Sequence, residues 1–272
     1  MVKDLCCKNI AAEERRLSHQ ESEQGVDMAA LYDKTAEQWV RDEPRLRDDL
    51  ISWPLLVSLT KQYGENRIIL DCGCGSGNVC RLVSPFAKTV IGIDISKRML
   101  EEAERHSAPP ANIVYLRGDM VQLAKHVPPS SVDLCISIFG CCCVRNLEEL
   151  VQTFKQMRKV VRVGGASLIQ IPHPLESFFT EKSSWVSDID LPGNYFESGK
   201  VIRRKLKTTD GAWLLVARHH FTISNYTDAM SGAGFRIAQV IEPRPSSEVL
   251  RTYPTLAREA KLPSSIIFIL EG

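Results

Sequence analysis

A turn rich in glycine and cysteine follows a short apolar run in this chain. Residues 69–78 read ILDCGCGSGN, with Asp71 at the end of the apolar run and glycines at positions 73, 75 and 77. Glycine lets the backbone approach a ligand closely where a Cβ atom would block it. Two chemistries fit such a turn: a ligand-binding loop built on the glycines, or a redox or metal site built on Cys72 and Cys74.

The cysteine spacing argues against a metal site and against a disulfide framework. Structural zinc sites usually place cysteines two to four residues apart and add a second such pair or a histidine pair. Here one residue separates Cys72 from Cys74, and residues 141–143 are contiguous cysteines. The chain has nine cysteines, an odd number, and no recognisable secretory signal. We therefore expect reduced thiols, no metal and a cytoplasmic location.

The glycine spacing separates two classes of nucleotide ligand. Dinucleotide-binding turns follow the pattern G-x-G-x-x-G/A. Counting from Gly73 places Asn78 at the third position, and counting from Gly75 places Cys80 there. A carboxylate at the strand end, Asp71, would repel a pyrophosphate but suits a ligand that carries positive charge. The pattern thus favours a cationic nucleoside and disfavours a nicotinamide-dependent reductase.

Apolar strands alternate with amphipathic helices around this turn. We expect strands at 67–71, 88–93, 112–116, 132–138 and 166–171, and helices at 78–85, 97–106, 120–127 and 146–161. The alternation predicts an α/β fold, a doubly wound and mainly parallel seven-stranded sheet with helices on both faces. Ligands bind outside the carboxyl ends of the strands in such a sheet, which is where the turn lies.

The alternation is interrupted after residue 171. Strands at 200–206 and 212–219, joined by a turn at Asp210-Gly211, predict a β-hairpin inside an insertion that follows strand 5. A helix at 222–232 and strands at 235–241 and 265–270 then complete the sheet. We divide the chain into a flexible tail at 1–27 and a single domain at 28–272, made of N-terminal helices (28–66), a ligand-binding core (67–171), a substrate cap (172–221) and the C-terminal part of the sheet (222–272).

An ordered set of motifs resembles class I S-adenosylmethionine-dependent methyltransferases of the small-molecule subgroup. The matching segments are YDKTAEQW at 32–39, ILDCGCGSG at 69–77, VIGIDIS at 90–96, GDM at 118–120, VDLCISIF at 132–139 and MRKVVRVGGASLIQI at 157–171. The resemblance covers roughly residues 28–172 and, less distinctively, 222–272. It implies a Rossmann-like fold with S-adenosylmethionine as the cofactor.

The resemblance also implies roles for single residues. Asp71 would hold the amino group of the cofactor, Asp94 its two ribose hydroxyls and Asp119 its adenine amino group. Backbone N–H groups of the turn and of the following helix N-terminus would hold its carboxylate. The expected cofactor-binding residues are Tyr32, Asp71, Gly73, Gly75, Gly77, Asp94, Ile95, Met99, Asp119, Met120 and Ser137.

The insertion at 172–221 is expected to present the methyl acceptor. Histidine is suited to accept a proton near neutral pH, so His173 in IPHP and His220 in HHFTISNY are candidate bases, with Tyr195 as a third catalytic candidate. Each histidine also has a structural interpretation, as a strand-end residue or as a hydrogen bond that orients the hairpin. His219 is expected to point to the face opposite to that of His220.

Composition limits the partners. The 34 basic and 33 acidic residues give a net charge of +1, so no basic field attracts nucleic acid. No apolar run is long enough to span a membrane. We expect methyl transfer to an O or N atom of a small-molecule acceptor by a monomer or homodimer. The alternatives are a non-catalytic member that binds cofactor or a partner and, less favoured, a nucleic-acid methyltransferase or an arsenite methyltransferase that uses Cys141–Cys143.

Overall fold

The structure of the protein is a computed structural model. It describes residues 26–39, 48–105, 110–181, 186–207 and 211–272. Residues 1–25 of the expected flexible tail, and Asp210 of the expected hairpin turn, lie outside the described residues.

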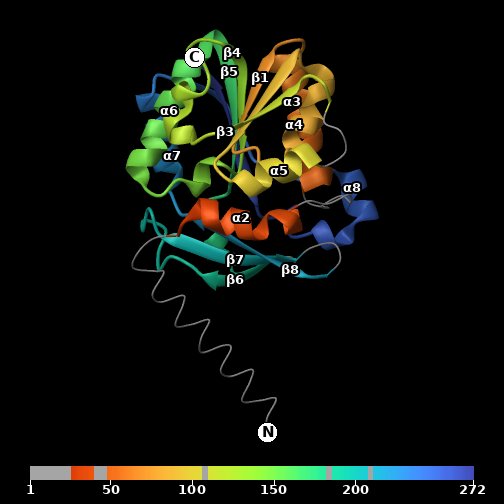
Figure 1. Ribbon diagram of the computed structural model, residues 1–272. Coiled ribbons are helices and arrows are strands. Elements are labelled where there is room, and N and C mark those ends of the chain that lie inside the picture. The colour runs from red at the N-terminus through yellow and green to blue at the C-terminus, as the bar shows by residue number, and fades with distance from the viewer. Residues whose placement is uncertain (1–25, 40–47, 106–109, 182–185, 208–210) are drawn as a thin grey trace.

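A seven-stranded sheet forms the centre of the molecule (Figure 1). Its strands lie in the order β3-β2-β1-β4-β5-β10-β9. They are β1 (Ile68–Cys72), β2 (Thr89–Asp94), β3 (Ile113–Arg117), β4 (Val132–Ile138), β5 (Val161–Pro172), β9 (Arg236–Ile241) and β10 (Ser265–Glu271). Neighbouring strands are parallel except where β10 pairs with β5 and β9. The predicted doubly wound, mainly parallel sheet is confirmed.

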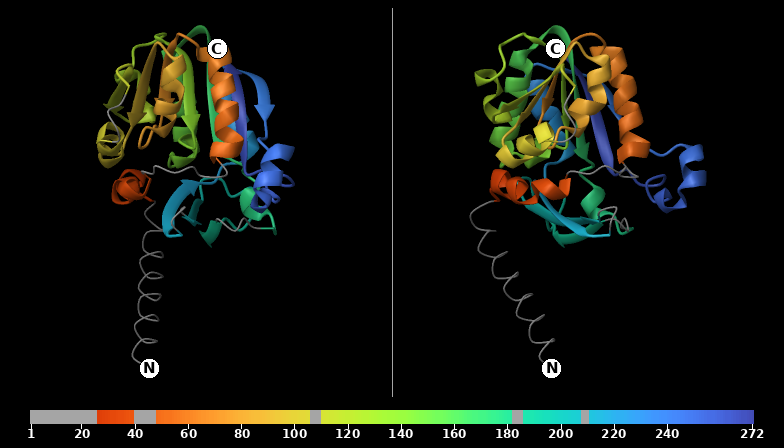
Figure 2. Two further views of the ribbon diagram at one scale, coloured as in Figure 1. Left: turned by 90° about the vertical axis from the view of Figure 1, so that its right-hand side faces the viewer. Right: turned by 45° about the vertical axis from the view of Figure 1, so that its right-hand side comes forward.

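Helices cover both faces of this sheet (Figures 1 and 2). The α-helices of the described residues are α2 (Met28–Trp39), α3 (Trp53–Gly64), α4 (Asn78–Val83), α5 (Lys97–Arg105), α6 (Leu147–Val160), α7 (Ile223–Gly232) and α8 (Ser247–Thr252). The helices α3, α4 and α5 lie on one face, and α6 and α7 lie on the other. Ile69 packs into one core and Leu70 into the other, as expected for a strand that is buried on both faces.

Short helical turns complete the connections between these elements. They are η1 (Asp48–Ser52), η2 (Ser84–Phe86), η3 (Met120–Lys125), η4 (Cys141–Cys143), η5 (Glu176–Phe178) and η6 (Pro254–Leu256). The helix expected at 120–127 is the six-residue 3-10 segment η3, capped by Asp119, whose Oδ1 accepts a hydrogen bond from the Val121 N–H at 2.9 Å. Within the described residues, no helix has the length and apolar character needed to cross a membrane.

Strand β5 begins at Val161 rather than at residue 166. The glycine pair at 164–165 lies inside the strand. Val161 already pairs with Val132, and the register between β4 and β5 shifts before Leu134. Gly164 has φ of 73°, a conformation that a residue with a side chain rarely adopts, so the glycine accommodates an irregularity within the strand.

The insertion after β5 forms a second, antiparallel sheet of three strands. Its order is β6-β7-β8, with β6 (Val186–Asp190), β7 (Val201–Lys207) and β8 (Trp213–His219). The predicted hairpin of β7 and β8 is confirmed, whereas β6 was missed because VSDID carries only two apolar residues. Figures 1 and 2 show α2 between this small sheet and one end of the large sheet.

Candidate functional site

A cavity of about 750 Å³ lies at the carboxyl ends of the central strands. Asp71 at the end of β1, Asp94 at the end of β2 and Ile138 at the end of β4 contribute to its wall. Tyr32 from α2 and His219 from β8 also line it. The cavity thus lies between the central sheet, the N-terminal helix α2 and the inserted sheet.

The glycine turn folds back onto β2. Gly73 and Gly75 have φ of 76° and 54°, the left-handed region that glycine adopts without strain. The N–H groups of Gly73 and Cys74 donate to the Ile93 carbonyl at 2.8 and 3.1 Å. A Cβ atom on Gly73 would lie 3.1 Å from the Cα atom of Gly140. Glycine is required here because two backbone segments meet under the cavity.

Asp71 is a buried acid at the floor of the cavity. Only 1% of its surface is exposed, and the Cys80 thiol donates to its Oδ2 at 3.2 Å. Burial raises the pKa of Asp71 to about 7, although the hydrogen bond from Cys80 acts in the opposite direction. A positively charged group placed in the cavity would stabilise the ionised carboxylate.

Both carboxylate oxygens of Asp94 accept hydrogen bonds from backbone N–H groups. Its Oδ1 accepts from the Ser96 N–H at 2.9 Å, and its Oδ2 accepts from the Gly75 N–H at 2.8 Å. Burial raises the pKa of Asp94, and these N–H groups oppose that shift. Each oxygen keeps a further lone pair, so a pair of hydroxyl donors fits this fixed carboxylate. Ser96 is the cap of α5, because its Oγ accepts from the Met99 N–H at 3.1 Å.

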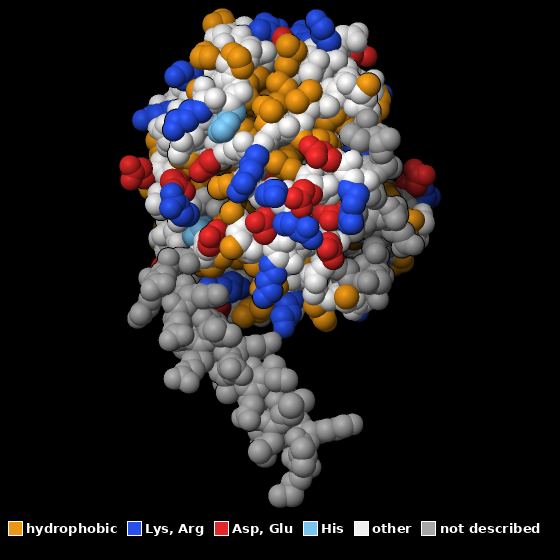
Figure 3. Space-filling view, in the orientation of Figure 1, with side chains coloured by type: hydrophobic (Ala, Val, Ile, Leu, Met, Phe, Trp, Pro, Cys, Tyr) orange, Lys and Arg blue, Asp and Glu red, His pale blue; other side chains and the backbone are white. Residues whose placement is uncertain are grey.

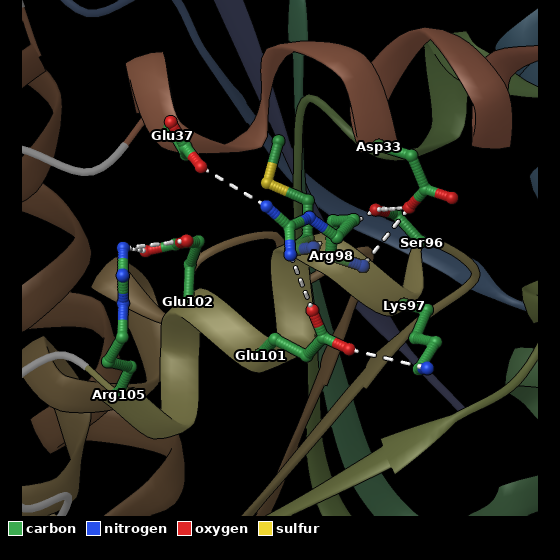
Figure 4. Close-up of polar contacts among 9 residues, drawn as sticks. Asp33, Glu37, Ser96, Lys97, Arg98, Glu101, Glu102 and Arg105 are labelled. Atoms are coloured by element: carbon green, nitrogen blue, oxygen red, sulfur yellow. Dashed lines mark hydrogen bonds and ion pairs between the residues drawn. The ribbon is translucent and has the colours of Figure 1, made fainter.

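The helix α2 is held over the cavity from two sides. On one side, Asp33 Oδ1 accepts from Ser96 Oγ at 2.6 Å and from the Arg98 N–H at 3.1 Å (Figure 4). On the other side, the Tyr32 hydroxyl donates to the Ala217 carbonyl of β8 at 3.3 Å. These bonds connect the start of α5, directly after β2, to the inserted sheet through a single helix.

Comparison with known proteins identifies the family of this chain. A family described as a methyltransferase domain matches residues 69–165. The crystal structure of an S-adenosylmethionine-dependent methyltransferase from Mesorhizobium loti is 27% identical, with a TM-score of 0.63, over 81% of this chain and 97% of that one. The chain belongs to the class I S-adenosylmethionine-dependent methyltransferases.

Two curated methyltransferases are also similar to this methyltransferase. The N-demethylindolmycin N-methyltransferase of Streptomyces griseus is 25% identical over 179 residues, which are 61% of this chain and 68% of that protein. The trans-aconitate 2-methyltransferase of Afipia carboxidovorans is 31% identical over 153 residues, which are 54% of this chain and 53% of that protein.

The cavity of this methyltransferase fits S-adenosylmethionine. The cofactor carries an amino group, a sulfonium and a ribose diol, and the cavity offers the buried acid Asp71 and the oriented carboxylate Asp94. Most of the residues expected from the sequence line the cavity, namely Tyr32, Asp71, Gly73, Gly75, Asp94, Ile95, Met99, Asp119 and Met120.

Two expected cofactor-binding residues do not line the cavity. Gly77 precedes α4 with φ of 77°, and its role is to start that helix. Ser137 is fully buried, and its Oγ donates to the Cys72 carbonyl at 2.9 Å. Both residues therefore shape the turn and its support within the part of the chain that the structure describes.

The backbone N–H groups of the turn are already used inside the protein. Besides Gly73 and Cys74, which donate to Ile93, Gly75 donates to Asp94 and Gly77 donates to the Cys74 carbonyl at 3.0 Å. The expectation that these donors hold the cofactor carboxylate is therefore not supported for these four residues. The glycine at position 73 instead allows close approach of the turn to the backbone of Gly140.

The candidate bases His173 and His220 are placed outside the lining of the cavity. His173 Nε2 lies 3.0 Å from Glu242 Oε1, and its Nδ1 accepts from the Leu175 N–H at 3.2 Å. His220 Nε2 lies 2.7 Å from the Tyr195 carbonyl. In the described residues, these contacts match the structural interpretation of both histidines.

Tyr195, the third candidate, also supports the insertion. Its hydroxyl accepts a hydrogen bond from the Ile223 N–H at 2.8 Å, at the start of α7, and its ring packs edge-on against the rings of Phe178 and His220. This packing joins the insertion to the C-terminal part of the sheet. None of its contacts with other described residues reaches the lining of the cavity.

His219 lines the cavity instead of its neighbour. It is 4% exposed, and its Nδ1 has no hydrogen-bond partner among the described residues. Alternation along β8 correctly predicts that His219 and His220 face opposite ways, but it does not say which face meets α2. Ala217 shares the face of His219, and the bond from Tyr32 to the Ala217 carbonyl identifies that strand as the neighbour of the helix.

Sequence reasoning missed several other residues of the wall. Trp39, Trp53, Arg145 and Glu149 line the cavity. The Arg145 side chain and backbone N–H both donate to Glu149, at 2.6 and 2.9 Å. Burial would raise the pKa of Glu149, but these hydrogen bonds outweigh it and the pKa is lowered. Arg145 and Glu149 belong to no motif. They reach the cavity only because of the position of α6, which contains Glu149 and begins shortly after Arg145.

The cysteine run at Cys141–Cys143 does not form a thiol cluster directed at a ligand. Cys141 donates to Ser137 Oγ at 3.5 Å, and Cys142 donates to the Phe139 carbonyl at 3.1 Å. Cys143 lines the cavity, with its Sγ 3.5 Å from the Tyr32 hydroxyl. Over the ranges that the structure describes, no group of three or more His, Cys, Asp or Glu side chains could hold a metal ion.

Proposed function

We propose that this methyltransferase transfers the methyl group of S-adenosylmethionine to an oxygen or nitrogen atom of a small molecule. One observation carries the proposal. The same cavity that contains Asp71 and Asp94 extends to Trp39, Trp53 and His219. Its volume of about 750 Å³ is in the range of pockets that enclose small organic ligands.

The residues divide into two roles in this proposal. When bound, S-adenosylmethionine supplies an activated methyl group on a sulfonium. Asp71 binds its amino group, Asp94 orients the ribose and Asp119 meets the adenine. On the other side, α2 and the inserted sheet at 172–221 cover the methyl group, exclude water and align the acceptor.

The class of acceptor is supported by the relatives and by the surface. The two curated relatives are named for small molecules, N-demethylindolmycin and trans-aconitate. The second is a carboxylate, so the relatives support the size of the acceptor and not its charge. On the face drawn in Figure 3, basic and acidic side chains are interspersed over the middle of the molecule. An even mixture of charges does not concentrate a polyanion such as nucleic acid.

Two measurements, made one after the other, test this function. Isothermal titration with S-adenosylhomocysteine and with NADH checks the cofactor class, and we expect micromolar binding of the first and none of the second. Methyl transfer from radiolabelled S-adenosylmethionine is then measured with a library of small hydroxyl and amine compounds and, in parallel, with tRNA and DNA. Transfer to nucleic acid alone contradicts the proposal, and cofactor binding without transfer to any acceptor favours a binding protein.

A further inference from the structure

Five residues form a connected part of the cavity wall, which we call the acceptor wall. They are Tyr32, Cys143, Arg145, Glu149 and His219. Tyr32 contacts Cys143 at 3.5 Å and the backbone of β8 at the Ala217 carbonyl. Arg145 bonds to Glu149, and the charges of Glu149 and His219 influence each other's pKa. The wall thus combines one histidine with a fixed carboxylate.

The charge of the cavity is negative. Its described lining contains the carboxylates of Asp27, Asp71, Asp94, Asp119 and Glu149. The single guanidinium in that lining belongs to Arg145, and Glu149 accepts hydrogen bonds from both its side chain and its N–H. Arg145 is therefore already neutralised, and an incoming carboxylate would meet repulsion without an available cation.

His219 is the polar group of this wall that lacks a partner. Its Nδ1 is enclosed and unbonded among the described residues, which leaves Nε2 as the ring nitrogen that can meet a molecule in the cavity. Burial lowers the pKa of His219, and the charge of Glu149 opposes that shift. The ring is therefore neutral near neutral pH and can accept a proton.

We propose that His219 accepts the proton from a hydroxyl or amine nucleophile, and that the acceptor wall selects amine and neutral hydroxyl acceptors against carboxylates. The proposal rests on the proposed methyl transfer to a small molecule. The lone pair of the acceptor forms the new bond to the methyl carbon, the electron pair of the broken carbon–sulfur bond stays on sulfur, and the acceptor proton passes to Nε2 of His219. Glu149 stabilises the resulting imidazolium.

The first experiment measures the pKa of His219 without any acceptor. The protein with bound S-adenosylhomocysteine is titrated by histidine NMR, and His219→Asn assigns the signal. The titratable and charged groups around the ring are Tyr32, Cys143, Arg145 and Glu149 on the acceptor wall and Asp27, Asp71, Asp94 and Asp119 on the rest of the lining.

We expect the pKa of His219 to lie below the ordinary value of about 6.5. Glu149→Gln should lower it further because it removes the nearby negative charge. The matched control is Glu148→Gln, on the same helix but outside this lining, and it should leave the value unchanged. A pKa at or above about 6.5, or equal shifts in the two variants, overturns the proton-acceptor role.

The second experiment tests the selection of the acceptor with three indoles that differ in one group. Tryptamine, indole-3-ethanol and indole-3-acetate share a ring that suits the aromatic residues Tyr32, Trp39 and Trp53 of the lining. Their binding to the complex with S-adenosylhomocysteine is measured by ligand-observed NMR and titration. We expect tryptamine and indole-3-ethanol to bind at least about tenfold more tightly than indole-3-acetate.

The outcomes of the second experiment distinguish the proposed selection of acceptors from the proposed methyltransferase function. Preference for indole-3-acetate, equal binding of the three, or no binding of any of them overturns the selection, while binding of S-adenosylhomocysteine still supports the methyltransferase function. Loss of S-adenosylhomocysteine binding itself contradicts the function. In Glu149→Gln the preference for tryptamine over indole-3-acetate should shrink, whereas in Glu148→Gln it should persist.

Discussion

Ser96 Oγ donates a hydrogen bond of 2.6 Å to Asp33 Oδ1 and so ties α2 to the N-terminus of α5 (Figure 4). The same serine caps α5 and follows Asp94 by two residues. The carboxylate expected to hold the ribose and the helix that covers the cavity are thus attached to one short segment. Cofactor binding and the position of α2 should therefore depend on each other.

Replacing Asp33 by alanine should loosen α2 and weaken cofactor binding. The variant loses the acceptor for Ser96 Oγ and for the Arg98 N–H, and we expect a decrease in affinity for S-adenosylhomocysteine of about tenfold, or ~1.4 kcal/mol. Titration calorimetry measures the affinity, and hydrogen exchange over residues 28–39 measures the helix. The neighbouring exposed Lys34, changed to alanine, is the control; an equal loss in that variant would contradict the coupling.

Replacing Asp94 by alanine should weaken S-adenosylhomocysteine binding far more than replacing Cys72 by alanine. Asp94 is expected to accept hydrogen bonds from the ribose, and loss of such bonds to a charged group costs about 2–3 kcal/mol. Cys72 contacts the Cys135 thiol at 3.7 Å, away from the cavity lining. Calorimetric titration compares the two variants. Effects of equal size would refute the interpretation that the glycines and acids of the turn, and not its cysteines, bind the cofactor.

The affinity for S-adenosylhomocysteine should rise with pH between about 6 and 8. Asp71 has a pKa of about 7 in the free protein because it is buried, and its ionised form is the one that holds a cationic amino group. This folded-state pKa lies above the unfolded value of about 3.9, so the carboxyl stabilises the fold most at low pH and loses that contribution as the pH rises towards 7.

Asp71→Asn provides the test of both pH effects. The variant should bind more weakly at pH 8 and lose most of the dependence of affinity on pH, and its unfolding free energy should fall less between about pH 4 and 7 than that of the parent. Asp228→Asn, at an exposed position of α7, serves as the control. A pH profile of Asp71→Asn that matches the parent would show that Asp71 does not titrate in this range.

Replacing Gly77 by alanine should destabilise the turn. Gly77 has φ of 77°, and an added Cβ would collide with the hydroxyl end of the Tyr115 side chain. Backbone strain alone costs about 1–2 kcal/mol, and thermal unfolding measures the loss. Gly232 in α7 has open space around its Cβ position, so Gly232→Ala should leave the unfolding temperature unchanged or higher. Equal behaviour of the two variants would argue against this account of the turn.

The cofactor side of the site was predictable because it is encoded locally. Asp71 and Asp94 each end a strand, and Gly73 and Gly75 follow directly, so a correct assignment of strands already places them at one edge of the sheet. The succession of strands along the chain and the hairpin of β7 and β8 followed from the same periodicity. Strand β6 did not, since its sequence is too polar to stand out from a loop.

The acceptor side was not predictable because it depends on contacts between distant segments. The bond from Tyr32 to the Ala217 carbonyl joins residues 185 positions apart, and it decides that His219 rather than His220 meets the cavity. His173 and Tyr195 have suitable chemistry, but hydrogen bonds to Glu242 and Ile223 direct them elsewhere. The alternation of side chains along a strand defines two faces, but it does not indicate which of them a helix distant in the sequence covers.

The cysteines near the cavity differ in how readily they would react with an electrophile. Burial raises the pKa of Cys74 to about 11 and that of Cys141 to about 12. The neighbouring Cys142 thiol lowers the pKa of Cys143, which lines the cavity. Because the thiolate is the reactive form, iodoacetamide should modify Cys143 ahead of Cys74 and Cys141, and bound cofactor should slow that modification. The rate of alkylation at one thiol thus reports the occupancy of the cavity before any acceptor is known.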